Sequence, residues 1–580
     1  MNEDPQAFVS EKSYLVADCG QTLTKLALFE VVSGSYRLIA HTSTMTTAGE
    51  PWLDVRIGIQ NGLRHLAKIT GRRFLDDRGE LIRPFQANGS GVDYFTTIIS
   101  CAPRLRTILT GLFNHVSLNQ AHHVMQTNYT EVIDVFSLSD TRSKGAQIAI
   151  IVQNRPDLIL ITGGTNDGAR GRLLELVDTI AIGVEETDSD WRPTVIFAGN
   201  EGVHEDVETR FDSANELKLT SNLQPQLETE NLDDAIELVS ETYRVLKINQ
   251  LPGIREVNDW SPSPATSTAN ALTNIVNFIA KSKEQRLMAV DLGSGSLSLV
   301  YASPTDKQTS VNSDLGLGRP LTQLLDTVSM QDINRWLPSS IDEQEIIDFV
   351  YQKALHPQTV AILEKEILLE QALSRELIRK GLQSSLAAWG THGEGASPQV
   401  DALIVRGSAF SHAPRYGPII LTLLDAIQPT GIFSISVDKY DILPALGKLA
   451  SIDPLVVVQS LENGVLPLLA WVIAPVGVGK PGQKVVTITV ESGTPKLPDV
   501  EVEYGAVELL PLPQGAPAKV TIKPTRRFDI GAGPGRSHTL TVYGGLLGLV
   551  IDARGRPLIR PQKANEQHSQ MRQWLRDVGG

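Results

Sequence analysis

Two short turns rich in aspartate, glycine and hydroxyl residues carry the clearest chemical signal in this sequence. The first runs from Asp18 to Lys25 (Asp-Cys-Gly-Gln-Thr-Leu-Thr-Lys), and the second runs from Asp291 to Ser296 (Asp-Leu-Gly-Ser-Gly-Ser). Each turn follows an apolar segment and leads into another, which predicts a strand, a tight turn and a second strand. Glycine lets main-chain N–H groups approach an anion, and the threonine and serine hydroxyls add donors. Both turns are therefore predicted to bind phosphate.

An aspartate opens each turn. A carboxylate does not favourably touch phosphate, but it can bind a hydrated Mg²⁺ ion that bridges phosphate oxygens. Asp18 and Asp291 are therefore the candidate metal ligands, and as loop residues we expect them to tolerate alanine without loss of the fold. Either turn alone could be an ordinary β-hairpin, because Asp-x-Gly is common where a chain reverses. The two copies have matched strand contexts and lie 291 − 18 = 273 residues apart, and this duplication favours a clamp around one polyphosphate.

The bulk composition is typical of a globular protein. Among 580 residues, 41% are hydrophobic and 20% are charged, and no stretch approaches the roughly 18 apolar residues that span a bilayer. The formal net charge of −14 opposes general binding to nucleic acid or to an anionic membrane. Two cysteines are too few for a disulfide framework or a zinc site. The start of the chain is polar and lacks the pattern of a secretion signal, so we expect a cytoplasmic protein.

The order of the predicted elements indicates an α/β protein with two related halves and a third part. Each phosphate turn begins a unit of two strands, a third strand and a helix, so we place a first domain at 1–283 and a second at 284–450. Residues 451–580 are assigned to a return segment and a β-rich C-terminal module, because short strands alternate with Pro/Gly turns from about residue 484 and a helical pattern closes the chain.

Strand-to-loop junctions also occur inside the first domain. Apolar strands at 157–161 and 193–197 each run into a glycine-containing loop followed by a helical pattern, an order typical of a parallel sheet. A third junction follows the strand at 402–405, where the loop begins Arg406-Gly407. The sequence therefore predicts several loops at the carboxyl ends of strands, where α/β proteins commonly bind ligands.

This combination resembles the superfamily of actin, hexokinase and heat-shock-protein-seventy ATPases, in which a nucleotide lies between two related domains. More narrowly, the sequence is similar to the glutamate mutase MutL family, which is unrelated to the mismatch-repair protein of the same name. Four segments carry this similarity: Pro156–Gly168, Val195–Asn200, Asp441–Gly447 and Gly544–Leu558. The Thr-Gly-Gly-Thr loop in the first and the Asp-Ala-Arg-Gly-Arg-Pro run in the last are the most specific.

The resemblance implies an actin-like ATPase that binds ATP and Mg²⁺ in a cleft between its two ββ β α domains. It places Gly407 and Ser408 against the adenosine and assigns phosphate contacts to both turns. The phosphate contacts are Gly20, Thr22 and Thr24 in the first turn and Gly293, Ser294, Gly295 and Ser296 in the second.

The sequence also departs from the family pattern. Arg406-Gly407 stands where relatives often have two adjacent glycines, and 294–298 (Ser-Gly-Ser-Leu-Ser) stands where many have Gly-x-Thr-Thr-Asp. The second change removes a carboxylate, which favours reduced hydrolysis. Whether ATP is hydrolysed, as in a slow Mg²⁺-dependent ATPase, or only bound stays open.

Four further residues have competing interpretations. Lys25 either neutralises a β- or γ-phosphate or is an ordinary lysine on an exposed strand face. Asp167 could position water or contact Mg²⁺, and it is then a third candidate catalytic residue beside Asp18 and Asp291. Alternatively, Asp167 caps the next helix. Arg554 and Arg556 either bind a partner carboxylate or phosphate with planar bidentate geometry or are solvated charges.

The resemblance implies an ATP-binding accessory protein, a chaperone or reactivating factor for an adenosylcobalamin-dependent mutase such as glutamate mutase, that works by nucleotide-driven domain closure. The chain lacks the Asp-x-His-x-x-Gly element common in cobalamin-binding proteins, so it is not expected to be the mutase itself. Two other classes stay open: a small-molecule kinase with Asp167 or Asp291 as base, and a nucleotide-binding scaffold without turnover. The sequence does not identify the partner mutase or the oligomeric state.

Overall fold

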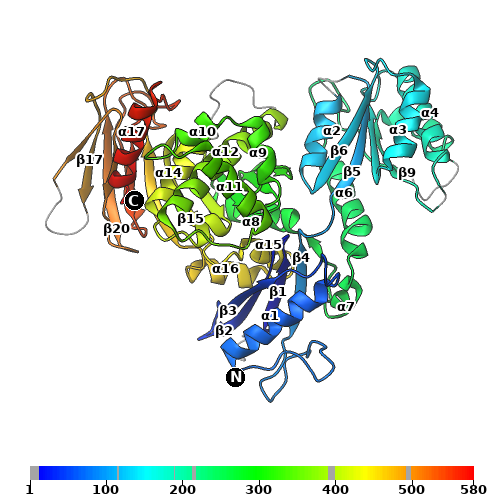
Figure 1. Cartoon of the computed structure of the whole chain (residues 1–580), viewed down its shortest axis with the longest axis horizontal. Coiled ribbons are helices and arrows are strands. Elements are labelled where there is room, and N and C mark those ends of the chain that lie inside the picture. The colour runs from blue at the N-terminus through cyan, green and yellow to red at the C-terminus, as the bar shows by residue number, and fades with distance from the viewer. Residues whose placement is uncertain are drawn as a thin grey trace, which may run out of the picture.

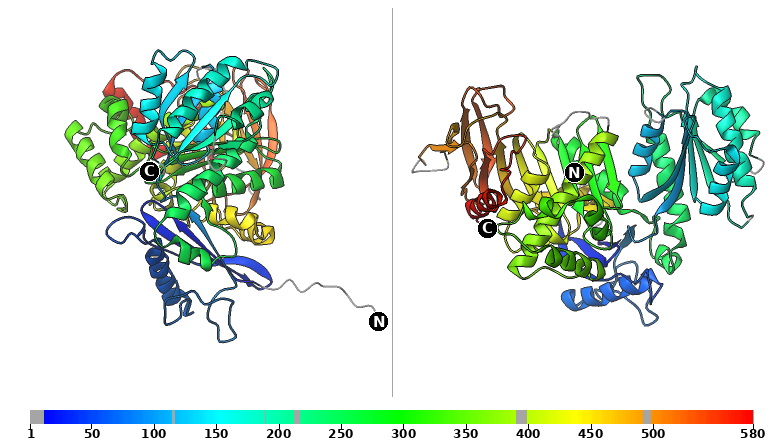
Figure 2. Two further views of the ribbon diagram at one scale, coloured as in Figure 1. Left: turned by 90° about the vertical axis from the view of Figure 1, so that its right-hand side faces the viewer. Right: turned by 45° about the horizontal axis from the view of Figure 1, so that its top comes forward.

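Four β-sheets organise the part of the chain that the computed structural model describes, which is residues 12–113, 117–188, 190–211, 217–389, 399–491 and 498–579. Figures 1 and 2 show a lobe built on a parallel sheet at one end of the molecule and a β-rich part at the other. Two sheets of related topology lie between these ends.

The first sheet contains the first phosphate turn and has the strand order β10-β4-β1-β2-β3. Its strands are β1 (Tyr14–Cys19), β2 (Leu23–Val32), β3 (Ser35–Met45), β4 (Tyr94–Ile99) and β10 (Thr266–Ser267). The helices of this half are α1 (Val55–Thr70) and α8 (Thr268–Lys283). Buried positions recur along α1 at intervals of three and four residues, as expected for a helix that covers a sheet. At Gly62 an added Cβ would lie 1.8 Å from a methyl group of Leu26, so glycine permits the close packing of α1 on β2.

The second sheet repeats this arrangement and extends it, with the order β13-β12-β11-β14-β15-β16-β22-β19. Its strands are β11 (Leu287–Leu292), β12 (Leu297–Ala302), β13 (Lys307–Asn312), β14 (Ala402–Arg406), β15 (Gly431–Val437), β16 (Leu468–Ala474), β19 (Val507–Leu510) and β22 (Gly548–Asp552). The helices are α9 (Leu321–Thr327), α10 (Met330–Asn334), α11 (Glu343–Leu355), α12 (Glu364–Ala388), α13 (Ser408–Ser411), α14 (Gly417–Ala426), α15 (Leu443–Ala450) and α16 (Pro454–Glu462).

The pairing pattern confirms the predicted duplication. β1 is antiparallel to β2 and parallel to β4, and β11 is likewise antiparallel to β12 and parallel to β14. Helices α8 and α15, each placed after the outer strand of the repeated unit, pack so closely that a Cβ on Gly447 would lie 1.8 Å from the carbonyl oxygen of Ala271. One hydrophobic cluster includes residues of both sheets and of both helices. The two halves therefore share a core.

A third sheet is inserted between β4 and β10. It has the order β6-β5-β7-β8-β9 and all its pairs are parallel, which confirms the predicted parallel sheet. The strands are β5 (Leu105–Gly111), β6 (Thr130–Ser137), β7 (Leu158–Gly163), β8 (Thr194–Gly199) and β9 (Leu217–Leu219). The helices are α2 (Ser117–Gln126), α3 (Lys144–Asn154), α4 (Gly171–Glu185), η1 (Glu201–Val203) and α5 (His204–Glu208), and then α6 (Asp233–Leu246), η2 (Ile248–Gln250) and α7 (Ile254–Asp259) lead back to β10. One face of this sheet has a hydrophobic core of its own, and its other face joins the core of the first sheet.

The fourth sheet confirms the β-rich C-terminal part. Its strands, in the order β18-β17-β20-β21, are β17 (Lys484–Glu491), β18 (Val500–Glu503), β20 (Pro517–Pro524) and β21 (His538–Tyr543), and the helix α17 (Ala564–Asp577) follows. β19 and β22 from the same stretch join the second sheet, so this part is continuous with the second half. The domain boundaries predicted after residues 283 and 450 stay predictions. Within the described ranges, no helix is long and apolar enough to cross a membrane.

The two arginines of the Asp-Ala-Arg-Gly-Arg-Pro run are buried, so the interpretation of Arg554 and Arg556 as solvated charges is wrong. Their exposed fractions are 2% and 7%. Arg554 donates to Asp552 at 2.8 Å and to Asp425 at 2.6 Å, and Arg556 donates to Asp552 at 2.5 Å. Burial alone would raise the pKa of Asp552, but the two guanidinium groups hold it well below its usual range. The run fastens the end of β22 to α14 through an internal ion network.

Replacing Arg554 should therefore destabilise the protein strongly. Arg554→Met leaves the carboxylates of Asp425 and Asp552 buried with too few counter-charges, and we expect a loss of about 3–5 kcal/mol in unfolding free energy. Urea denaturation followed by circular dichroism measures it. Arg172→Met is the matched control, because its pair with Glu175 is largely exposed and its removal should cost about 0.5 kcal/mol or less. Equal effects of the two substitutions would contradict the internal network.

Candidate functional site

The two phosphate turns have the same internal geometry. In the first, the N–H of Gly20 donates to the carbonyl of Leu23 at 3.0 Å, and in the second the N–H of Gly293 donates to the carbonyl of Ser296 at 3.0 Å. Each turn joins two antiparallel strands, as the sequence predicted. The structure therefore places equivalent glycines at equivalent points of the two halves.

The two turns also touch one another. The hydroxyl of Thr22 donates to the hydroxyl of Ser294 at 2.8 Å, across the boundary between the two halves. Gly295 lies so close to the first turn that an added Cβ would be 2.5 Å from Cγ of Gln21. The predicted phosphate contacts of both halves are therefore brought to one place.

Asp18 and Asp291 occupy matching positions just before the turns. Asp18 pairs with Lys25 across β1 and β2, and Asp291 pairs with Ser298 across β11 and β12. Both aspartates thus belong to strands, and the expectation that they lie in loops is wrong. Asp18 is 5% exposed, so alanine at this position would remove a buried, bonded group.

Arg406 at the end of β14 bridges these two carboxylates. Its Nη2 donates to Asp18 at 2.6 Å and its Nη1 donates to Asp291 at 2.5 Å. The arginine is 6% exposed. Because Asp18 belongs to the first half while Arg406 and Asp291 belong to the second, this ion pair ties the halves together at the base of the two turns.

Two further aspartates complete the cluster. Nε of Arg406 lies 3.6 Å from Asp438 and 3.9 Å from Asp441, and it makes no hydrogen bond to a described residue. Lys25, from the first half, forms an ion pair with Asp441 at 2.9 Å. Lys25 is thus engaged with a carboxylate and is not an ordinary lysine on an exposed strand face, and its predicted contact with phosphate stays a prediction. The cluster holds four carboxylates against two cations.

The buried charges shift one another's protonation equilibria. Burial raises the pKa of Asp18, against the opposing effect of Arg406 and Lys25 and a hydrogen bond from Thr268 at 3.2 Å. Burial alone would lower the pKa of Arg406, but the surrounding aspartates hold it well above its usual range. Arg406 therefore stays charged and forms ion pairs with carboxylates of both halves.

The turns have the donors that a polyphosphate needs. The backbone N–H groups of Gln21, Thr22, Ser294 and Gly295 make no hydrogen bond to any residue that the structure describes. Unpaired N–H groups in tight turns, with hydroxyls beside them, are the donor set that binds phosphate oxygens. The residues present therefore fit a nucleotide phosphate chain lying between the turns.

The carboxylates fit a metal ion less readily. Across the described ranges, no group of three or more His, Cys, Asp or Glu side chains is arranged to hold a metal ion. Asp18 and Asp291 each face the guanidinium of Arg406, which stands where a shared cation would be held. A Mg²⁺ ion could be held by Asp18 or Asp291 only if Arg406 moved away from that carboxylate.

Thr24 lies behind the first turn. It is fully buried, and its Oγ1 is 3.1 Å from the hydroxyl of Thr46, which in turn donates to the carbonyl of Gly20 at 2.8 Å. This chain of hydroxyls supports the turn from the core. The predicted phosphate contact of Thr24 stays a prediction, and the observed role is structural.

Gly407 and Ser408 follow Arg406 and lie beside the second turn. Gly407 has φ = +119°, and an added Cβ would lie 2.1 Å from the carbonyl oxygen of Leu292. Only glycine allows β14 to end so close to β11. Ser408 begins the short helix α13. The loop predicted to contact adenosine is thus adjacent to the phosphate turns.

Asp167 is remote from this cluster. β4 ends beside the first turn, and β5 begins 105 − 99 = 6 residues later. The seven residues of β5 span about 20 Å, so its far end lies about that distance from the start of the strand. β7 is parallel to β5 with Thr162 opposite Gly111, so the loop that contains Asp167 lies at the far end. The helix after this loop has Arg170 as its N-cap and no side-chain cap, so the capping interpretation of Asp167 is wrong.

The central roles of Arg406, Asp438 and Asp441 were not predicted from the sequence. In the sequence, Arg406 stands out only as a departure from a glycine pair. Asp438 and Asp441 follow β15, the parallel neighbour of β14, and this was a usable signal because carboxyl ends of adjacent parallel strands meet at one edge. The pairing of these residues with the first half could not be read from local pattern.

Comparison with known proteins decides the family. The family model described as MutL protein matches residues 14–465, which includes both turns and the whole cluster. The chain belongs to the MutL family. This confirms the resemblance to the glutamate mutase MutL family. No curated protein matches the chain.

Several solved structures are similar to this MutL protein at low identity. A nucleotide-free acetone carboxylase matches with 9% identity over 85% of this chain and 81% of that chain, with a TM-score of 0.33. A nucleotide-free diol dehydratase-reactivating factor matches with 8% identity, 76% and 99% coverage and a TM-score of 0.33. A gluconate kinase from Lactobacillus acidophilus matches with 11% identity, 80% and 93% coverage and a TM-score of 0.32. Likenesses with TM-scores this low do not bear on function.

The buried cluster should give the MutL protein a distinct dependence of stability on pH. Burial, and then repulsion by Asp441, raises the pKa of Asp438 from 3.8 to about 6. The folded state therefore binds this proton more tightly than the unfolded state, and the stability it confers is present below about pH 4 and lost as the pH rises through about 6. Asp438→Asn should remove this fall in unfolding free energy, on the order of 2–3 kcal/mol.

Urea denaturation at several values between pH 4 and 7 measures the effect. Asp314→Asn is the control, since its carboxylate is 71% exposed and the charge change is the same. A wild-type protein and an Asp438→Asn variant with parallel pH profiles would contradict the raised pKa.

Proposed function

We propose that this MutL-family protein binds ATP with Mg²⁺ between its two turns and acts as an accessory protein, a chaperone or reactivating factor, for an adenosylcobalamin-dependent mutase such as glutamate mutase. The contact between Thr22 and Ser294, which sets two unpaired donor turns face to face, is the observation that carries the nucleotide site. Family membership supports the accessory role. When bound, the metal ion would neutralise charge on the phosphate oxygens.

The contacts that cross between the halves suggest how nucleotide alters the protein. Three links join the halves at the site: Thr22 to Ser294, Asp18 to Arg406, and Lys25 to Asp441. A phosphate chain entering between the turns would compete for the first link, and a cation, if Asp18 held one, would compete with the second. Nucleotide binding therefore changes the relative placement of the halves, and a partner that binds one placement better is gripped or released.

A second candidate function is a nucleotide-binding scaffold without turnover. The observation that favours it is Arg406, which engages both turn aspartates and leaves neither free to act as a base. A small-molecule kinase has less support, because Asp167 lies at the far end of the inserted sheet and Asp291 is paired. The accessory role and the scaffold differ in whether bound ATP is turned over.

Calorimetric titration with Mg²⁺-ATP and with a non-hydrolysable analogue tests the nucleotide site. We expect both to bind to the wild-type protein with similar affinity, and we expect ADP release to be slow. The double variant Thr22→Val/Ser294→Ala removes two hydroxyl donors and should weaken binding about tenfold, since about 1.4 kcal/mol is expected for the two hydrogen bonds lost. These substitutions leave the buried ion cluster in place.

The matched control is Thr521→Val/Thr539→Val, which removes a second pair of hydroxyls, 3.1 Å apart, on strands β20 and β21. It should leave the affinity unchanged within about twofold, since it lies outside the clamp. Absence of binding in the wild-type protein, or equal weakening in the two double variants, would contradict the proposed site. Tight binding without ADP release would favour the scaffold.

A further inference from the structure

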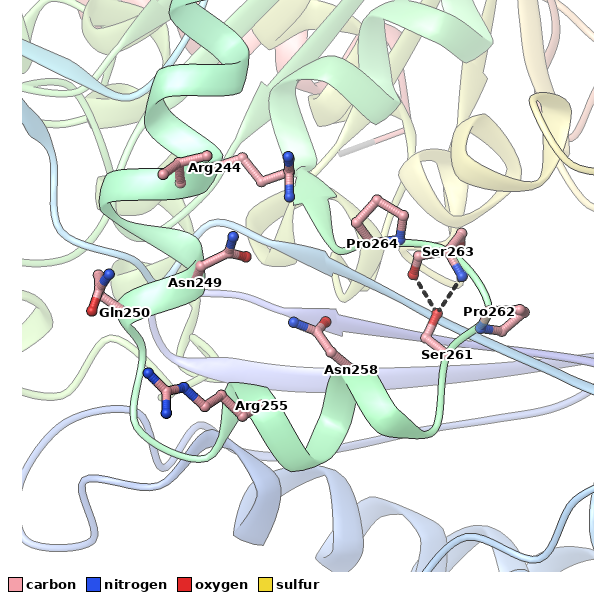
Figure 3. A pocket seen from close by; sticks show the side chains of 10 residues that line it. Arg244, Asn249, Gln250, Arg255, Asn258, Ser261, Pro262, Ser263 and Pro264 are labelled. Atoms are coloured by element: carbon pink, nitrogen blue, oxygen red, sulfur yellow. Dashed lines mark hydrogen bonds between the residues drawn. The ribbon is translucent and has the colours of Figure 1, made fainter. Parts of the chain in front are cut away.

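A pocket of about 450 Å³ lies away from the phosphate turns, between the end of α6, η2, α7 and the loop 261–264 (Figure 3). Pockets of this size accommodate small molecules. The lining residues are Arg244, Val245, Asn249, Gln250, Arg255, Asn258, Ser261, Pro262, Ser263 and Pro264. None of these described lining residues is acidic, although the whole chain carries a net charge of −14. The lining of the pocket therefore lacks the negative charge that predominates in the protein as a whole.

Three polar side chains converge on the pocket from different elements. Figure 3 shows Arg244 reaching over the space from α6, Asn249 entering from η2 and Asn258 pointing up from α7. Nε and Nη2 of Arg244 both donate to the carboxylate of Glu241, Nε at 2.9 Å, and its Nη1 makes no hydrogen bond to a described residue. The pocket thus presents Nη1 of an ion-paired guanidinium together with two carboxamides.

The carboxamide of Asn258 has an unmet acceptor. Its Oδ1 is buried and accepts no hydrogen bond from any residue that the structure describes. A buried acceptor without a donor costs about 1–3 kcal/mol, and a ligand hydroxyl could offset this cost once the Asn258 side chain turns toward the pocket. On the opposite wall, the hydroxyl of Ser261 and the backbone of Ser263 bond to one another, which fixes the loop. The pocket therefore offers Nη1 of Arg244 to an anion and Oδ1 of Asn258 to a hydrogen-bond donor.

Lys448 adds positive charge behind the loop. It is 8% exposed, and its Nζ donates to the carbonyl of Pro264 at 2.9 Å. Burial, and then repulsion by Arg244, lowers the pKa of Lys448 to about 8. The two cations repel each other, and Lys448 has no ion pair with a described residue. An anion in the pocket would relieve this repulsion.

We propose that this pocket binds a small hydroxylated anion, such as a sugar phosphate or a hydroxy acid. The anionic group pairs with the guanidinium of Arg244, the carboxamides of Asn249 and Asn258 bond to neighbouring oxygens, and a ligand hydroxyl donates to Oδ1 of Asn258. This site is separate from the proposed nucleotide site and does not depend on it.

The place of the pocket connects it to the cluster. The loop 261–264 leads through β10 into α8, whose first residue, Thr268, donates to Asp18 at 3.2 Å. Lys448 belongs to α15, which packs on α8. A ligand that holds this loop therefore contacts the segment that enters the junction between the halves.

Calorimetric titration of the full chain with glucose 6-phosphate, citrate and glucose, at matched ionic strength, tests the proposal. We expect glucose 6-phosphate or citrate to bind and glucose not to bind, and the choice between the two anions distinguishes a phosphate ester from a carboxylate. Arg244→Met and Asn258→Leu should each weaken binding about tenfold or more, because each removes a hydrogen bond to a charged or buried group. Arg244→Lys, which keeps the charge, should retain part of the affinity and shows that the fold is intact.

Two controls separate this pocket from other anion sites. Arg172→Met replaces another helix arginine paired with a glutamate three residues away and should leave the affinity unchanged. Thr22→Val/Ser294→Ala alters the phosphate turns and should also leave it unchanged. Failure of both anions to bind, equal binding of glucose, or loss of binding in the turn variant but not in Arg244→Met would overturn the proposal.

Discussion

The guanidinium of Arg406 is the group on which the junction between the two halves depends. Taking a charge out of water is costly, and a buried ion is tolerated only where opposite charges and hydrogen bonds surround it. Arg406 meets this condition with Asp18 from one half and Asp291 from the other, and with Asp438 and Asp441 beyond its hydrogen-bond range. Without it, Asp18 and Asp291 would each lose the ion pair that compensates their charge.

The repeated topology explains how this arrangement arises. In each half the first strand ends in a phosphate turn and has a parallel neighbour, so β14 brings its last residue to the edge where β11 turns. After Arg406 the chain passes close to the backbone of Leu292. Gly407 makes this possible, because a Cβ atom at this position would collide with the carbonyl oxygen of Leu292. The close contact of α8 with α15 holds the two sheets near enough for Arg406 to reach Asp18.

The sequence was sufficient for features that depend on local pattern. Alternating apolar segments with Asp-x-Gly turns predicted both hairpins, and strand-to-loop junctions predicted a parallel sheet, because such patterns reflect the geometry of neighbouring residues. Contacts between distant residues were out of reach. Arg406 meets Asp18 across 388 positions, and Arg554 meets Asp425 across 129. Asp167 was misplaced for the same reason, since its position depends on the direction of an inserted sheet.

The central claim is that a nucleotide phosphate chain lies between the two turns and that the cation bound with it displaces Arg406 from the ion pair that joins the halves. A crystal structure of the full chain with Mg²⁺ and a non-hydrolysable ATP analogue tests it most directly. The account predicts phosphate oxygens on the N–H groups of the turns at 20–22 and 293–296, with Arg406 no longer bridging Asp18 and Asp291. Nucleotide bound elsewhere, or bound between the turns with Arg406 still bridging both carboxylates beside the metal ion, would contradict it.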